Sequence, residues 1–193
     1  MAVAHSAAFI SAVAWGGVRV LSLAGGFAGE YRQKVDAKGR VSVPADLRVH
    51  FAEDDAAHAQ QGRGVYVTLN FSPTLKNECF RLYSSAYMAR LKASIAKMKA
   101  GSREQKMAQF TLLQKTKVLE IDADGRIVVP KQFRDQFGNT DEALFLGSGD
   151  YVEVWDAGLY AQKEQEMLDA LLGEFGENFD PVSLVDMSEG DNE

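Results

Sequence analysis

A segment of 14 residues occurs twice in this chain, and the repeat limits the folds that the chain can adopt. Residues 35–48 return 86 positions later as residues 121–134. Seven of the 14 positions are identical in the two copies, and Val/Ile or Leu/Phe exchanges occupy three more. Self-similarity of this kind indicates one supersecondary unit that is used twice. We therefore interpret the chain as two related modules in tandem.

Each copy predicts a strand, a tight turn and a short return strand. The turns have the pattern Asp-x-x-Gly-Arg, with Asp36 and Gly39 in the first copy and Asp122 and Gly125 in the second. An Asp side chain can accept hydrogen bonds from backbone N–H groups just after it, and Gly supplies a positive φ. A helix should begin at the proline of Pro-x-x-x-Arg, because proline fits the first helical turn. Further strands are expected over 65–69, 80–83, 143–146 and 151–155.

The remaining helices are predicted from capping residues and apolar spacing. Ser84 should cap a helix, and Ser102 should open another with a capping box. Gly173 is expected to end the last helix. Met107, Phe110 and Leu113 should lie on the inward face of the helix that begins after Ser102, within stripes that form either core or subunit contacts.

The charge of the chain is unevenly distributed. The net charge is −6, and acidic proteins are seldom nucleic-acid binders. However, residues 27–115 contain 15 Lys and Arg against 8 Asp and Glu, whereas residues 116–173 contain 5 against 12. Residues 174–193 add seven acids and no base. Such asymmetry indicates an electrostatic partner or two complementary surfaces.

Little in the sequence suggests catalysis or a metal centre. One cysteine, Cys79, excludes an intramolecular disulfide and a cysteine-based zinc cluster. Three histidines lack ligand-like spacing, and neither a phosphate-binding glycine loop nor a recognised nucleophile pattern is present. We expect no enzyme activity, no cofactor, no metal and no membrane association.

Residues 1–26 contain one charged residue, Arg19. They are interpreted as a disordered extension or a misassigned start, with a targeting segment or an additional element as alternatives. The positively charged region that precedes a secretory signal is missing, and small and polar residues dilute the apolar run.

The chain resembles the MraZ proteins over about residues 27–172. The resemblance is carried by Phe27-x-Gly29-x-Tyr31, both repeat segments and residues 80–83 and 152–155, in this order. It implies an α+β fold of two tandem SpoVT-AbrB swapped-hairpin modules, with a small β-barrel-like core and peripheral helices. The expected organisation is an extension (1–26), module 1 (27–86), a helical connector (87–114), module 2 (115–158), a C-terminal helix (159–173) and an acidic tail (174–193).

The resemblance also implies a function. Members of the family are cytoplasmic, nucleoid-associated transcriptional regulators that assemble as ring-shaped homo-oligomers. They bind direct repeats in double-stranded DNA upstream of their own division and cell-wall gene cluster and typically repress it. They also commonly begin just before the Phe-x-Gly, so this start is expected to be misassigned, with initiation between residues 18 and 23.

The candidate DNA-binding residues are basic residues in or near the turns, because guanidinium and ammonium groups suit phosphate and guanine. They are Lys34, Lys38, Arg40, Arg48 and Arg126, and the turns that position them are shaped by Asp36, Gly39, Asp122 and Gly125. The second copy has Asp124 where the first has Lys38, and Glu120 where the first has Lys34. Its turn should therefore attract phosphate less.

Two alternatives remain open at the level of the sequence. The repeated Asp and Arg residues could be purely structural, with each Asp capping its turn and each Arg pairing with a carboxylate. The protein could also be an oligomeric scaffold without DNA binding, in which the basic and acidic segments meet between subunits.

Overall fold

The computed structural model describes residues 12–15, 18–21, 26–54, 65–71, 78–137, 141–176 and 179–183. The chain forms two compact units, Met1–Ala157 and Gly158–Glu193. Both copies of the repeat lie in the first unit. Most of the expected N-terminal extension and acidic tail falls outside the described residues, as does the loop over 55–64.

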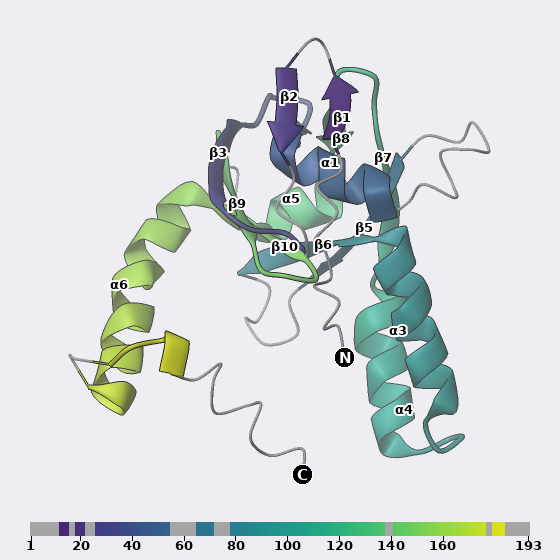
Figure 1. Ribbon diagram of the computed structural model, residues 1–193. Coiled ribbons are helices and arrows are strands. Elements are labelled where there is room, and N and C mark those ends of the chain that lie inside the picture. Colours follow the sequence, from purple (N-terminus) through teal and green to yellow (C-terminus); the bar gives the residue numbers. More distant parts are fainter. Residues whose placement is uncertain are drawn as a thin grey trace, which may run out of the picture. The chain divides into compact units, whose positions relative to one another are not determined.

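The two copies fold into the same succession of elements, as the repeat predicts (Figure 1). In the first copy these are β3 (Glu30–Lys34), β4 (Arg40–Ser42), α1 (Ala45–Asp54), β5 (Val65–Phe71) and β6 (Cys79–Ser84). In the second copy they are β7 (Lys117–Ile121), β8 (Arg126–Val128), α5 (Lys131–Phe137), β9 (Glu142–Gly147) and β10 (Val152–Asp156). The predicted strands and the helices after the prolines are confirmed.

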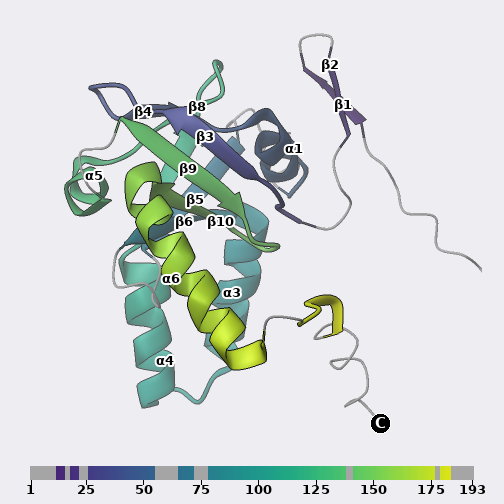
Figure 2. The same ribbon diagram turned by 90° about the vertical axis from the view of Figure 1, so that its left-hand side faces the viewer.

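The first strand of each copy pairs with the other copy. A six-stranded antiparallel sheet has the order β3-β9-β10-β6-β5-β7. In this sheet β3 joins β9, as Figure 2 shows, and β7 joins β5. The pair β6–β10 lies at the centre. Reading the order backwards exchanges the two copies, so the sheet has an approximate twofold relation. Neither copy has a complete sheet of its own.

The short strands β4 and β8 form a separate antiparallel ribbon. The α+β class is therefore confirmed, but the expected barrel-like core is wrong. The described strands form an open sheet and a ribbon, with no closed barrel among them. The physical reason is that β3 and β7 stand at opposite edges of the sheet and do not pair with each other.

The apolar positions of the repeat form the core. Val41, Leu47 and Phe51 of the first copy are at most 1% exposed, and so are Ile127 and Phe133 of the second. In a strand the alternate residues share a face, so each short strand buries one face against the sheet and helices. The buried residues of the central strands include Phe80, Leu82, Leu144, Phe145, Val152, Val154 and Trp155.

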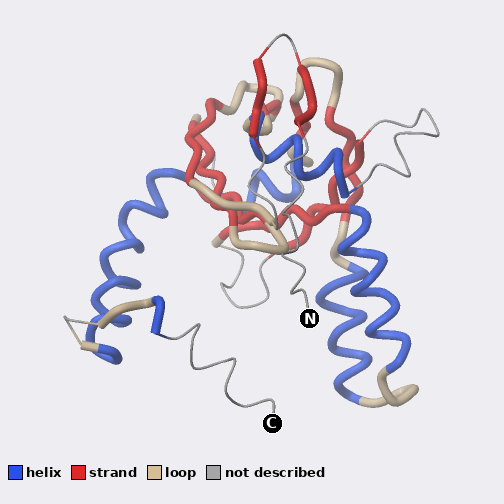
Figure 3. The backbone as a smooth tube through the Cα atoms, viewed as in Figure 1, coloured by secondary structure: helices blue, strands red, loops and turns tan. Residues whose placement is uncertain are grey.

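A helical arm follows the first copy, made of α3 (Ser85–Lys97), α4 (Arg103–Ala108) and the π-helical segment η1 (Gln109–Gln114). Both serine caps are confirmed, because Ser84 Oγ accepts from Tyr87 N and Ser102 Oγ accepts from Gln105 N, each at 3.1 Å. The second bond of the predicted capping box differs, since Gln105 Oε1 accepts from Gly101 N and not from Ser102 N. Figure 3 shows the helices of the arm side by side, extending away from the strands.

For two residues of this arm the prediction of a core contact is wrong, and a subunit contact stays a prediction. Met107 is 63% exposed and Phe110 is 50% exposed. The rest of the described chain therefore leaves these two side chains largely uncovered.

The second unit contains most of α6 (Ala157–Phe175), and this helix does not end at Gly173 as predicted. Gly173 keeps a helical conformation, whereas Gly176 has φ +88° and donates its N–H to Leu172 O at 2.7 Å. Gly176 therefore ends the helix. The helix leaves several large apolar side chains exposed, namely Met167, Leu168, Leu171, Leu172 and Phe175.

Within the N-terminal extension the structure describes a small antiparallel hairpin, β1 (Ala12–Trp15) with β2 (Val18–Leu21). Among the described residues, no helix combines the length and the apolar character that crossing a membrane requires.

Candidate nucleic-acid interface

The two Asp-x-x-Gly-Arg turns have the same hydrogen-bonded geometry. Asp36 Oδ1 accepts from the backbone N–H groups of Lys38 and Arg40, both at 2.9 Å. Asp122 Oδ1 accepts from the equivalent groups of Asp124 and Arg126 at 3.0 and 2.8 Å. In each turn the glycine N–H also donates to the carbonyl of the Asp, at 2.8 and 2.9 Å.

The glycines of these turns have φ values that other residues rarely adopt. Gly39 has φ +78° and Gly125 has φ +76°. Both turns thus follow from residues that lie within five positions of one another.

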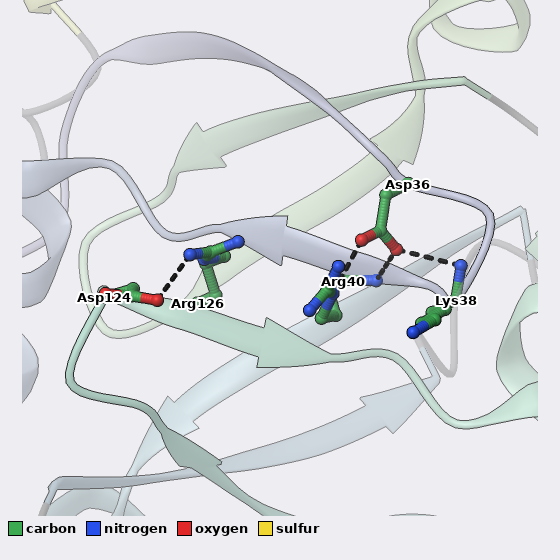
Figure 4. A network of polar contacts seen from close by, with 5 residues as sticks. All are labelled: Asp36, Lys38, Arg40, Asp124 and Arg126. Carbon is green, nitrogen blue, oxygen red and sulfur yellow. Dashed lines mark hydrogen bonds and ion pairs between the residues drawn. The ribbon is translucent and has the colours of Figure 1, made fainter.

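The ribbon of β4 and β8 joins the turns and presents two arginines on its outer face. Val41 pairs with Ile127 at its centre, and both side chains are buried. Arg40 and Arg126 point to the opposite face, with side chains that are 43% and 37% exposed (Figure 4). A two-stranded ribbon of this kind fits the major groove of DNA.

The arginines of the two turns have different partners. Arg40 donates from Nε to Asp36 Oδ2 at 2.6 Å, within its own turn. Arg126 instead pairs through Nη2 with the carboxylate of Asp124, as Figure 4 shows. Hydrogen bonds from the Arg40 backbone, the Arg40 side chain and the Lys38 backbone hold the pKa of Asp36 below its ordinary value.

A further arginine crosses from each copy to the turn of the other. A Cβ atom on Gly39 would lie 2.6 Å from Cδ of Arg134, and one on Gly125 would overlap the guanidinium of Arg48. Arg134 Nε is buried beside the first turn and makes no hydrogen bond with the described residues. Arg48 therefore accompanies Arg126 rather than Arg40.

The structure thus brings together only part of the predicted set. Lys38 and Arg40 lie in the first turn, and the exposed Lys34 ends the strand that leads into it. Sequence reasoning missed Arg134, which belongs to the second copy but packs on the first turn. The repeat contained the information needed to find Arg134, because Arg134 aligns with Arg48.

The two turns differ in the balance of basic and acidic side chains around them. The first turn has Lys38, Arg40 and the neighbouring Arg134 against one acid, Asp36. The second has two bases, Arg126 and Arg48, and two acids, Asp122 and Asp124. An anion such as a phosphate would be attracted to the first turn.

The structure also describes the single cysteine and the residue types that could bind a metal. Cys79 is a free, buried thiol in β6. Within the described ranges, no three His, Cys, Asp or Glu side chains are grouped as a metal site would need.

Comparison with known proteins identifies relatives over most of the chain. The family model described as "MraZ protein, putative antitoxin-like" matches residues 27–62 and 112–173, just over half of the chain. A protein of Ruegeria pomeroyi named "Transcriptional regulator MraZ" is 30% identical over 164 residues, covering 85% of this chain and 97% of that protein. A protein of the same name from Parvibaculum lavamentivorans is 33% identical over 135 residues, covering 70% of this chain and 78% of that protein.

Proposed function

The chain belongs to the MraZ family, and from this membership we propose that it is a transcriptional regulator that binds double-stranded DNA through its first turn and the ribbon beside it. The observation that carries the proposal is the exposed, positively charged first turn, with Lys38 and Arg40 beside Arg134. Relatives named as transcriptional regulators support it.

The role of each residue in the first turn follows from its contacts. Asp36 holds the backbone of the turn and orients Arg40 through Nε. The terminal nitrogens of a guanidinium can then contact two phosphate oxygens or the edge of a guanine. Lys38 contributes a mobile positive charge, and Lys34 contributes another at the end of β3.

The finer parts of the proposal concern assembly and regulation. We propose that several chains form a ring-shaped homo-oligomer that engages direct repeats in the promoter of its own division and cell-wall gene cluster and represses it. One turn offers few contacts, so binding of several chains to repeated sites would supply the affinity. The protein would act in the cytoplasm, associated with the nucleoid. The exposed apolar residues of α4, η1 and α6 are available for self-association.

The proposal is tested by fluorescence anisotropy with labelled duplexes from the region upstream of the gene. Wild-type protein should bind, and its affinity should fall steeply as salt rises, because phosphate contacts release counterions. Arg40→Ala should lower specific affinity by a factor that corresponds to about 1–3 kcal/mol for each site.

The matched control is Arg103→Ala, which removes an exposed arginine from the helical arm and should leave affinity close to wild type. Absence of binding at every salt concentration would reject DNA binding and favour an oligomeric scaffold. Unchanged affinity in Arg40→Ala would remove this residue from the interface.

A further inference from the structure

The two turns are nearly identical in backbone, so any difference in binding must come from their side chains. The Asp-to-backbone hydrogen bonds of the two turns agree within 0.1 Å, and the φ values of Gly39 and Gly125 agree within 2°. The second turn therefore has the backbone needed to present an arginine as the first one does.

The side chains at one position differ by two elementary charges. Lys38 in the first turn corresponds to Asp124 in the second. The Asp124 carboxylate pairs with Nη2 of Arg126, a terminal nitrogen of the kind that contacts phosphate. In the first turn, Asp36 engages only Nε of Arg40.

The surroundings of Asp124 increase this difference. Its side chain is 68% exposed, so its negative charge faces the solvent from which a phosphate would approach. Asp122 is also exposed, and Glu120 replaces Lys34 on the strand before the turn. The negative charges of Asp124, Asp122 and Glu120 repel an approaching anion.

We infer that Asp124 occupies Arg126 in place of a phosphate and prevents the second turn from binding DNA, so that each chain uses one of its two turns, the first, to contact DNA. This inference rests on the proposed function. It makes the Asp124 carboxylate the group that decides whether each chain contacts DNA through one turn or through both.

Removing the carboxylate tests the inference without disturbing the turn. The backbone N–H of Asp124, not its side chain, bonds to Asp122. Asp124→Asn should therefore fold normally and free Arg126. In the anisotropy assay it should raise affinity, and Asp124→Lys should raise it by about three- to tenfold and steepen the plot of log K against log salt by about 1 for each chain.

Two further variants separate a local effect from a change of net charge. Glu166→Lys, on an exposed position of α6, alters the total charge by the same amount as Asp124→Lys. It should leave affinity and the salt slope close to wild type. Arg126→Ala should have little effect in the wild-type chain but should abolish most of the gain in Asp124→Lys.

The experiment distinguishes failure of this inference from failure of the proposed function. If wild-type protein does not bind DNA, the proposed function fails. If wild type binds but Asp124→Lys behaves as Glu166→Lys does, the inference fails. The inference is also rejected if Arg126→Ala alone weakens binding as much as Arg40→Ala.

Discussion

Arg81 and Glu153 occupy equivalent positions in the two copies and lie directly opposite each other where β6 pairs with β10. Arg81 donates from Nε and Nη2 to Glu153 Oε1 at 3.0 and 2.8 Å. Each side chain is only 14% exposed. Two identical residues at this place would put like charges face to face across the strands, which is destabilising. The exchange of sign therefore favours pairing of the first copy with the second.

Other contacts hold this pair in place. Burial lowers the pKa of Arg81, but hydrogen bonds to Glu153 and Tyr83 outweigh burial, and the pKa is raised above its ordinary value. The guanidinium also lies 4.2 Å from the centre of the Tyr151 ring. Arg81 is thus charged and fully engaged at the centre of the sheet.

Reversing one charge of this pair should destabilise the fold. We expect Arg81→Glu to lower the free energy of unfolding by about 3 kcal/mol or more, because it leaves two carboxylates buried side by side. The double variant Arg81→Glu with Glu153→Arg should recover more than half of the loss. Denaturant unfolding measures both changes. A single variant as stable as wild type would show that the pair does not favour pairing between the copies.

The crossing of Arg48 to the second turn predicts an unusually costly glycine substitution. Gly125→Ala should lose about 1–2 kcal/mol from the positive φ and more from displacing the guanidinium of Arg48. Gly101→Ala is the control, since Gly101 has φ +73° with no atom near a Cβ. In an Arg48→Ala background the cost at Gly125 should fall to that at Gly101. Equal costs at both glycines in the wild-type background would contradict the packing of Arg48.

The acid titration of Asp36 should report its hydrogen bonds. The pKa of Asp36 is lowered from 3.8, so the ionised carboxylate stabilises the folded turn above that pH. The contribution is lost as the pH falls from 3.8 through the folded-state pKa. Carboxyl carbon shifts measured by NMR should give a midpoint below 3.8. In Arg40→Ala the midpoint should move part of the way back, because the backbone N–H groups still donate. An unchanged midpoint in that variant would exclude the Arg40 side chain as a cause.

The exposed face of the helical arm should contribute to self-association and not to the fold of one chain. Phe110 is 50% exposed, so Phe110→Ser should change the free energy of unfolding by about 0.5 kcal/mol or less. It should nevertheless lower the mass measured by analytical ultracentrifugation. The buried Phe133→Ala is the contrasting control and should lose about 3–5 kcal/mol. A Phe110→Ser protein with the wild-type mass would exclude this face from the proposed assembly.

Much of the local structure could be predicted because its causes lie close together in the chain. Asp36 and Gly39 form their turn through contacts across five residues, and Ser84 caps α3 through a contact across three. Alternation placed Val41 on the buried face and Arg40 on the exposed face. The wrong prediction for Met107 and Phe110 depended on distant contacts, because both have apolar spacing but no other element of the described chain covers them.

Local hydrogen bonding, alternation and composition decide the features that could be predicted from the amino-acid order. These are the two modules, their turns, the order of their elements and the basic character of the first copy. The tertiary structure alone decided that β3 pairs with β9 and β7 with β5, and that Arg134 packs on Gly39 while Arg48 packs on Gly125. The reason is that a repeat offers each strand two similar partners. Contacts between residues about 50 to 115 positions apart select one of them. The local sequence pattern carries no information about that selection.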